Sequence, residues 1–311
     1  MAAPAAELTK GGVLAAKFTR PPRSLWTDAW WQFRRHRLAM VALGVLGALV
    51  VFTLVGPLVY HTPIDTIDFL QSLKGPSADH LLGTDDLGRD LLARVMFGGR
   101  ISIAVGITAV LLAITLGTTI GALAGFFSRL DNPLMRVTDL FLSLPGLPLL
   151  LVIIYLFRDS LRATFGPELG IFIMIVGVIG ILGWMPVARL VRAQFLSLKQ
   201  KEFVEAARSI GARDRRIIVR HILPNVLSPV LVAATIGVGG AILTESTLSF
   251  LGLGFPPDVP TWGRILFDAR NYLDIAPHWA IFPGLAIFLT VLSINFIGDG
   301  LRDALDPRKT N

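Results

Sequence analysis

Six apolar runs without a charged residue alternate with polar segments along the sequence. Each run is 18 to 27 residues long, and about 20 helical residues cross a hydrocarbon core roughly 30 Å thick. Backbone groups find no water in that core, so such runs are expected to cross it as α-helices. The pattern predicts an all-α integral membrane protein with six transmembrane helices. The predicted spans are Leu38–Tyr60, Ile101–Phe127, Leu140–Phe157, Leu169–Ala188, Ile222–Thr244 and Ile275–Gly298.

Prolines and glycines add detail to these spans. Pro145 and Pro148 lie inside the third run and should kink or break it, because proline lacks a backbone N–H. Glycines are frequent in the second and fifth runs, and small residues let helices approach closely in lipid. They are Gly117, Gly121 and Gly125 in the second run and Gly237, Gly239 and Gly240 in the fifth.

The composition agrees with a membrane protein. Hydrophobic residues make up 53% of the chain and charged residues 16%, with a mean hydropathy of +0.65, whereas soluble domains carry about a quarter charged residues. The absence of cysteine excludes disulfides, thiolate metal sites and cysteine nucleophiles. The first run follows a basic segment and is too long for a cleaved signal, so we expect a retained anchor.

The basic residues indicate how the chain is oriented. The net charge of +7 would suit nucleic acid, but the N-terminal basic residues lie among aromatic residues beside a span, which is typical of a helix at lipid headgroups. These residues are Trp26, Trp30, Trp31, Phe33, Arg34, Arg35 and Arg37. With a cytoplasmic N-terminus, 21 Lys and Arg residues fall inside (7 + 2 + 9 + 3) and 8 outside (4 + 2 + 2). The positive-inside rule therefore places both termini in the cytoplasm, and no nucleic-acid partner is expected.

This orientation divides the chain into five parts. We expect a cytoplasmic N-terminal segment with an interfacial Trp/Arg helix (1–37), a first span (38–60), an extracytoplasmic segment (61–100), a core of five spans (101–300) and a cytoplasmic tail (301–311). Within the core, residues of about 189–221 form a cytoplasmic loop, and residues 245–274 form an extracytoplasmic segment.

The cytoplasmic loop contains a short amphipathic helix. Its apolar, mostly small residues recur at helical spacing, and charged residues take the opposite side. The expected apolar face is Phe203, Ala206, Ala207 and Ile210, and the opposite face is Glu202, Glu205 and Arg208. Gly211 stands where a left-handed C-terminal cap is common. A second short helix is expected from about Asp214 to Pro224. A small-faced helix between two spans is suited to contact a cytoplasmic partner.

This loop resembles the EAA loop of permease subunits in ABC importers. The resemblance lies in Glu205-Ala206-Ala207, Gly211 and Leu223-Pro224. His221 occupies the position three residues before the proline where the motif normally has isoleucine, and Ile222 follows it.

A second string resembles a signature of the peptide-importer branch of these permeases, which includes dipeptide, oligopeptide and nickel systems. It comprises Gly83, Thr84, Asp85, Asp86, Leu87, Gly88, Arg89 and Asp90. Further matching strings are 245–257, 282–285 and 298–308, so the resemblance runs from about Trp31 to Arg308.

The same acidic string allows two interpretations from its residues alone. Gly83 and Gly88 interrupt helical periodicity, and Thr84 or Asp85 could cap the helix that enters the second span. Asp85, Asp86 and Asp90 could instead hold a metal. Because Arg89 and Arg94 stand beside them and no other ligand cluster is evident, we predict capping and ion pairing, with no metal.

The segment after the fifth span is too apolar for a solvated loop and is interrupted by Gly and Pro. We expect residues 245–257 to form a re-entrant or scoop-shaped element covered by protein. Glu245 and Asp299 are expected at span ends, where a charge costs less than at the bilayer centre. The spans should then contain no buried acid–base pair, which argues against an ion-coupled carrier and a membrane-embedded enzyme.

Motifs for catalysis and cofactors are absent from the sequence. It contains no G-x-x-x-x-G-K-[ST], H-E-x-x-H or G-x-S-x-G, and its five histidines are scattered. A few polar residues lie inside the spans and either line a pathway or bond a neighbouring helix, of which we favour the second. They are Thr115, Thr118, Thr119, Asn225, Thr235, Ser293 and Asn295. We expect no catalytic, cofactor or metal site.

The resemblance implies a type I ABC importer permease with a MetI-like fold. It implies that this chain forms half of a pathway for di- or oligopeptides, with a second homologous permease, two ATPase subunits that bind ATP and Mg²⁺, and an extracytoplasmic peptide-binding protein. The helix bearing Glu205 would dock on an ATPase subunit. Nickel or another small solute is the alternative cargo, and a stand-alone channel or ion-coupled carrier is the alternative of another class.

Overall fold

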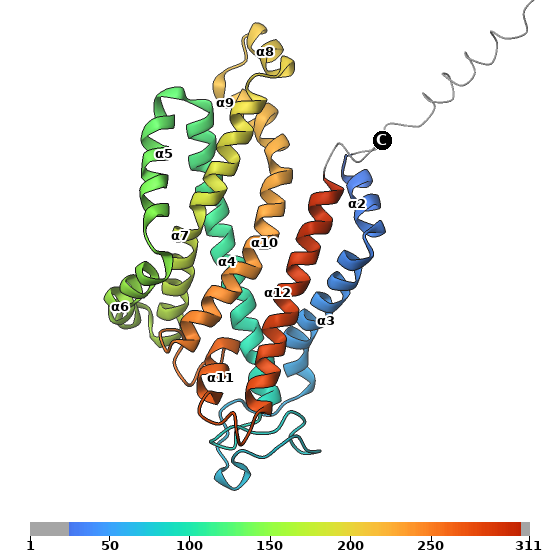
Figure 1. Ribbon diagram of the computed structural model, residues 1–311, viewed down its shortest axis with the longest axis vertical. Coiled ribbons are helices and arrows are strands. Elements are labelled where there is room, and N and C mark those ends of the chain that lie inside the picture. Colours follow the sequence, from blue (N-terminus) through green and yellow to red (C-terminus); the bar gives the residue numbers. More distant parts are fainter. Residues whose placement is uncertain (1–24, 306–311) are drawn as a thin grey trace, which may run out of the picture.

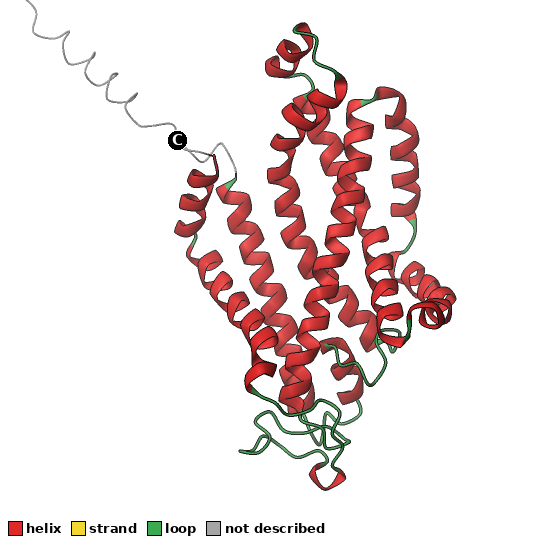
Figure 2. Ribbon diagram, turned by 180° about the vertical axis from the view of Figure 1, so that it is seen from behind, coloured by secondary structure: helices red, strands yellow, loops and turns green. Residues whose placement is uncertain are grey.

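A computed structural model describes residues 25–305 of the chain, which fold as helices joined by loops (Figures 1 and 2). Within these residues the only β-type pairing is an isolated bridge between Thr84 and Asp90. A short 3₁₀ helix covers Phe69–Gln71. The α-helices are α2 (Leu25–Arg35), α3 (Arg37–Val59), α4 (Leu91–Phe126), α5 (Ser128–Ser143), α6 (Gly146–Phe165), α7 (Pro167–Leu198), α8 (Glu202–Ser209), α9 (Asp214–Arg216), α10 (Leu223–Phe250), α11 (Trp262–Ala269) and α12 (His278–Ala304).

Five helical segments are long and apolar enough to cross a membrane. They are α3, α4, α7, the continuous segment Asp214–Phe250 and α12. The pair α5 and α6 provides a sixth span if it is counted as one, with a bend of 90° between its halves. Leu144 has extended backbone (φ −78°, ψ 140°), as expected for a residue before proline, and Pro145 is the N-cap residue of α6. The predicted break in the third run is confirmed.

The helices extend beyond several of the predicted runs. Helix α4 starts at Leu91, ten residues before its uncharged run, and includes Arg94 and Arg100. Helix α7 continues to Leu198, and α12 continues through Ala304 into the predicted tail. Hydropathy marks only the part of a helix that suits lipid, whereas capping groups determine where the helix ends. Helices α4 and α12 therefore extend across the predicted segment boundaries at 100 and 300.

The two ends of the bundle differ. Helix α8 projects from one end, and the start of α2 and the end of α12 lie at that same end (Figure 1). Helix α11 and the long loop before α4 lie at the opposite end (Figures 1 and 2). This is the same-side arrangement of α8 and the first and last helices that the charge count predicts.

Helix α2 covers the segment for which an interfacial helix is predicted. Phe33 is buried against Ala39 and Ile297 of α3 and α12, whereas Trp30 and Trp31 are exposed. The Arg35 guanidinium lies 4.0 Å from the centre of the Trp31 ring. An exposed Trp/Arg face suits lipid headgroups. Residues 1–24 of the predicted N-terminal segment lie outside the described residues.

Three glycines of α4 lie in close contact with α7. A methyl group on Gly121 would lie 2.5 Å from the carbonyl oxygen of Ala188, and Gly117 and Gly125 face Val187 and Phe195 in the same way. These glycines occur at four-residue spacing and therefore share one face of α4. The predicted use of small residues for close helix approach is confirmed for this pair of helices.

We expect Gly121→Ala to destabilise the protein by about 1–3 kcal/mol, the usual cost of overpacking a tight contact. The reason is that α4 and α7 would have to separate to admit the methyl group. Gly240→Ala is the control, because nothing lies within 4 Å of its added methyl group. Thermal unfolding of the two variants in the same detergent measures the difference, and equal unfolding temperatures would contradict the prediction.

Candidate functional site

Helix α8 is a short helix with a well-defined end. Gly211 has a positive φ of 80°, a conformation that glycine adopts at little cost. The N–H of Gly211 donates to the carbonyl of Arg208 (2.9 Å), and the N–H of Ala212 donates to that of Ala207 (3.0 Å). These two bonds define a Schellman motif. The predicted C-terminal cap at Gly211 is confirmed.

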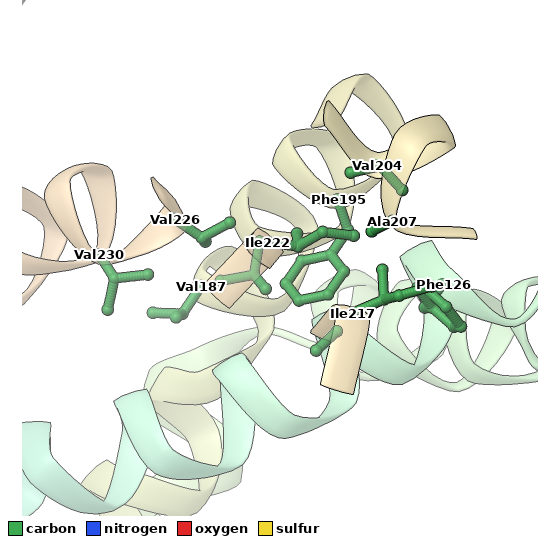
Figure 3. Close-up of a cluster of buried hydrophobic side chains, with 11 residues drawn as sticks. Phe126, Val187, Phe195, Val204, Ala207, Ile217, Ile222, Val226 and Val230 are labelled. Carbon is green, nitrogen blue, oxygen red and sulfur yellow. The ribbon is translucent and has the colours of Figure 1, made fainter. Parts of the chain in front are cut away.

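The inner side of α8 is anchored in the protein by apolar contacts. Val204 is completely buried and Ala207 nearly so, and both belong to one hydrophobic cluster, here called the α8 cluster (Figure 3). Its other members come from α4, α7, the turn before α10 and α10 itself. They are Ala122, Phe126, Val187, Val191, Phe195, Ile217, Ile222, Val226 and Val230. The cluster connects α8 to the ends of three long helices.

The outer side of α8 leaves apolar residues uncovered. Phe203 is 42% exposed and Ile210 is 86% exposed, and Ala206 between them is also exposed. Glu202 and Glu205 are exposed beside them. An exposed apolar patch with a charged rim is typical of an interaction surface.

The structure corrects the composition of the predicted apolar face. Phe203, Ala206 and Ile210 lie on the outer side, but Ala207 faces inward with Val204. Both sets have helical spacing, so α8 carries two apolar sides. Sequence reasoning missed Val204, although its position three residues before Ala207 was a usable signal.

The helix after α8 does not end at Pro224 as predicted. Residues Asp214–Phe250 form one continuous helical segment, in which Ile217–Ile222 is a π-helical stretch. The N–H of Leu223 donates to the carbonyl of Ile218, five residues earlier. This wider turn accommodates Pro224, which has no N–H to donate and would crowd a regular α-turn. It also points both Ile217 and Ile222 into the α8 cluster.

Comparison with protein families identifies this arrangement. Residues 113–311, which include α8 and its cluster, match the profile of the family described as binding-protein-dependent transport system inner membrane component. The chain belongs to this family. Residues 24–76 of the permease also match the N-terminal transmembrane domain of oligopeptide transport permease C. It is a multi-pass protein of the bacterial inner membrane and a subunit of an ABC importer.

Characterised relatives resemble the permease over almost its whole length. It is 39% identical to the dipeptide transport system permease protein DppC of Alkalihalophilus pseudofirmus, over 92% of this chain and 90% of the relative. It is 41% identical to the glutathione transport system permease protein GsiD of Pectobacterium atrosepticum, over 95% and 94%. It is 40% identical to the oligopeptide transport system permease protein OppC of Haemophilus influenzae, over 92% and 89%.

A solved structure supports the predicted fold class. The permease resembles a chain of the inward-facing MetNI methionine ABC transporter with a TM-score of 0.55, over 70% of this chain and 96% of that chain. The two share 19% sequence identity, so the likeness concerns the fold. The predicted MetI-like fold is confirmed.

The acidic string of the permease lies at the end opposite to α8 and is mostly buried. Asp85 is completely buried and accepts hydrogen bonds from the N–H groups of Leu87 (3.0 Å) and Arg89 (2.9 Å). The Arg89 Nε donates to it at 2.7 Å, and the Arg94 Nε lies 3.7 Å away. Burial, and next the charge of Asp85, raise the pKa of the half-buried Asp86 above its ordinary value.

Asp90 has a separate role from Asp85. Its carboxylate accepts from the N–H of Ala93 (2.8 Å) and caps α4. The Tyr60 hydroxyl donates to it at 2.8 Å, and the His80 Nδ1 lies 2.8 Å from the same oxygen. The predicted cap at Thr84 or Asp85 is therefore wrong, because Asp90 is the residue that adjoins the first turn.

The remaining signature residues shape the turn itself. Gly83 and Gly88 both have positive φ, at 83° and 73°. The Thr84 hydroxyl accepts from the N–H of Lys74 (3.0 Å) and contacts the carbonyl of Gln71. In residues 25–305 no group of three or more His, Cys, Asp or Glu side chains could hold a metal. Asp85 forms the predicted ion pair with Arg89, and Asp90 rather than Thr84 or Asp85 caps α4.

Glu245 does not mark the end of its helix, although the uncharged run ends at Thr244. It lies inside α10, which continues to Phe250, and it is completely buried. The predicted scoop-shaped segment accordingly starts later, with a turn after Phe250 that leads into α11. Sequence reasoning placed the helix end at the last residue of the uncharged run and so missed a buried carboxyl group.

Several polar residues in the spans bond their own helix. The hydroxyls of Thr115, Thr119 and Thr235 donate to carbonyls four residues earlier, and the Asn225 amide does the same. A hydroxyl that bonds its own helix does not hold a neighbouring helix in place. We predicted that these four residues bond a neighbouring helix. The structure shows each of them bonding its own helix instead, so the prediction is wrong for them.

Proposed function

We propose that this permease forms half of a translocation pathway for di- and oligopeptides in an ATP-driven importer. A second homologous permease forms the other half, and two separate ATPase subunits bind ATP and Mg²⁺. An extracytoplasmic binding protein delivers the peptide. Helix α8 faces the cytoplasm and docks on one of the ATPase subunits.

The observation that carries this proposal is the division of α8 into two sides. Val204 and Ala207 fix the helix to α4, α7 and α10 through the α8 cluster, while Phe203, Ala206 and Ile210 remain uncovered. A helix held in this way can transmit force from a bound partner to the spans. The absence of a phosphate-binding motif in the sequence is the reason to assign ATP hydrolysis to another chain.

The names of the relatives support peptide cargo. Dipeptide, glutathione and oligopeptide permeases are all about 40% identical to this chain over nine-tenths of its length. Glutathione is itself a small peptide, so the three names share one chemical class. Nickel is the alternative cargo, because the branch whose signature the acidic string resembles also includes nickel systems.

Reconstitution of the complete transporter tests this function. We expect proteoliposomes with both permeases, the ATPases and the binding protein to accumulate labelled dipeptide only when ATP is supplied. Labelled Ni²⁺ in parallel vesicles tests the alternative cargo. Peptide uptake by this chain alone, without ATPases, would instead identify a channel or ion-coupled carrier and would overturn the proposal.

A further inference from the structure

The first turn of α11 is inserted between α4 and α10. Trp262 is completely buried, and its indole Nε1 donates to the carbonyl of Val95 in α4 at 2.9 Å. A methyl group on Gly263 would lie 2.5 Å from the backbone of Ser246 in α10. A methyl group on Gly98 of α4 would likewise lie 3.2 Å from the backbone of Thr261. Helix α11 therefore touches both long helices at backbone distance.

Glu245 lies at the centre of this junction. The Ser249 hydroxyl donates to Glu245 Oε1 at 2.8 Å, and the Ser102 hydroxyl of α4 donates to Oε2 at 3.1 Å. Both carboxyl oxygens are thus occupied by hydroxyl donors from two helices. Within residues 25–305, the ion pairs of the structure do not include Glu245.

The same hydroxyl groups reach α11. The Trp262 N–H donates to the Ser102 oxygen at 3.4 Å, and the Thr261 hydroxyl donates to the Ser249 oxygen at 3.4 Å. The Thr261 oxygen also accepts from the Arg264 N–H (3.1 Å) and so caps α11. We call Glu245, Ser102, Ser249, Thr261 and Trp262 the Glu245 cluster. It connects α4 to α10 and α11, which follow much later in the chain.

Filling this buried site with a carboxyl group is energetically unfavourable. Burying it without a cation has a large desolvation cost, and apolar residues of similar size often stabilise a protein more. A fully hydrogen-bonded polar network, however, specifies one arrangement of its elements where apolar contacts would tolerate several. The cluster therefore suits a junction in which the relative position of three helices matters.

The two helices that hold α11 also hold α8. Phe126 at the far end of α4 and Val226 near the start of α10 both belong to the α8 cluster. The Glu245 cluster and the α8 cluster thus lie at opposite ends of the same pair of helices (Figure 1). On its other side, α11 presents charged residues to a cavity of about 400 Å³ that includes Arg264, Asp268 and Arg270.

We propose that Glu245 is a positioning residue that joins α11 to α4 and α10, so that a partner bound at the charged side of α11 displaces these helices and, through them, α8. The inference rests on the proposed function, because the partner at this end is the extracytoplasmic binding protein. Without the Glu245 cluster, α11 and α8 should each keep their own structure. Binding of the partner at α11, however, should no longer displace α8.

The first test compares Glu245→Gln with wild type in the assembled transporter. Gln has one acceptor oxygen where Glu has two, so one of the Ser102 and Ser249 hydroxyls loses its acceptor. We expect ATP hydrolysis without binding protein to stay within about twofold of wild type, and stimulation by the peptide-loaded binding protein to fall at least about fivefold. Thr247→Val is the control, because its hydroxyl donates only to the carbonyl of Leu243 in its own helix. Normal stimulation in Glu245→Gln would overturn the inference.

The second test measures the position of α11 directly. The chain has no cysteine, so spin labels can be attached at Asn271→Cys, next to α11, and at Ile107→Cys on the exposed side of α4. We expect one narrow distance distribution with Glu245 and a broad one with Glu245→Gln. A narrow distribution in both would show that the cluster does not position α11.

The design separates this inference from the proposed function. If wild-type vesicles fail to couple ATP hydrolysis to uptake, the function is wrong, while the label distances still decide whether Glu245 positions α11. If Glu245→Gln fails to assemble, Ser102→Ala combined with Ser249→Ala removes the two shorter hydroxyl bonds to Glu245, keeps the carboxyl group and leaves the longer bond from the Ser246 hydroxyl (3.5 Å). Loss of stimulation in that double variant supports the inference, and its retention overturns it.

Discussion

Either of the substitutions Phe203→Asp and Ile210→Asp is expected to reduce coupled peptide uptake at least about tenfold. Both side chains are on the uncovered side of α8, where the proposed ATPase groove would enclose them. Each substitution would bury a charge without a partner, and a loss of only about 1.4 kcal/mol of binding is tenfold in affinity. ATPase activity stimulated by the binding protein should fall together with uptake, and both are measured in the same proteoliposomes.

Two further α8 variants sharpen this test. Ser209→Ala is the matched control, because it alters an exposed residue of the same helix whose hydroxyl donates to the carbonyl of Glu205 within that helix, and it buries no charge. Gly211→Ala has open space around its added methyl group, but its positive φ should cost roughly 1–2 kcal/mol in a residue other than glycine. We therefore expect weakened coupling with normal assembly. Normal uptake and normal stimulation in both aspartate variants would exclude α8 as the docking element.

Asp85→Asn is expected to destabilise the permease by about 3–5 kcal/mol, the cost of removing one partner from a buried ion pair. The substitution would leave Arg89 and Arg94 buried near each other without their shared carboxylate. Unfolding in detergent and the yield of assembled transporter measure the loss.

The neighbouring Asp86→Asn variant is the control. Burial and the charge of Asp85 raise the pKa of Asp86, which means that its negative charge is disfavoured in the folded protein. Removing that charge should leave stability unchanged or slightly increase it. Equal destabilisation by the two substitutions would show that the Asp85 ion pairs do not hold this end of the protein together.

Much of the architecture could be predicted because it depends on local properties. Uncharged runs identify the spans, since only apolar helices suit the bilayer. Pro145 predicts the break between α5 and α6 because proline cannot continue a regular helix, and the structure bends there by 90°. Gly211 predicts the end of α8 for an equally local reason. The pairing of Asp85 with Arg89 could also be predicted from the sequence, because the two residues are only four positions apart.

Other features depend on contacts between distant segments. Phe203, Ala206 and Ile210 and, on the other side, Val204 and Ala207 all have helical spacing, so periodicity alone could not choose the buried side of α8. The α8 cluster made that choice, with residues from α4, α7 and α10. The local sequence likewise predicts Thr84 or Asp85 as the cap of α4, whereas in the fold Asp90 is the residue that adjoins the first turn.

The sequence by itself determined the class of protein, the order of the long apolar helices, and the placement of α8 on the same side as the first and last helices. These follow from hydropathy, charge and single residues such as Pro145 and Gly211. Only the tertiary structure decided which face of α8 is free, that α4 begins at Leu91, and that Glu245 is buried. Ser102 and Thr261 are 143 and 16 residues away from Glu245 in the chain, and no local pattern predicts that packing brings them together.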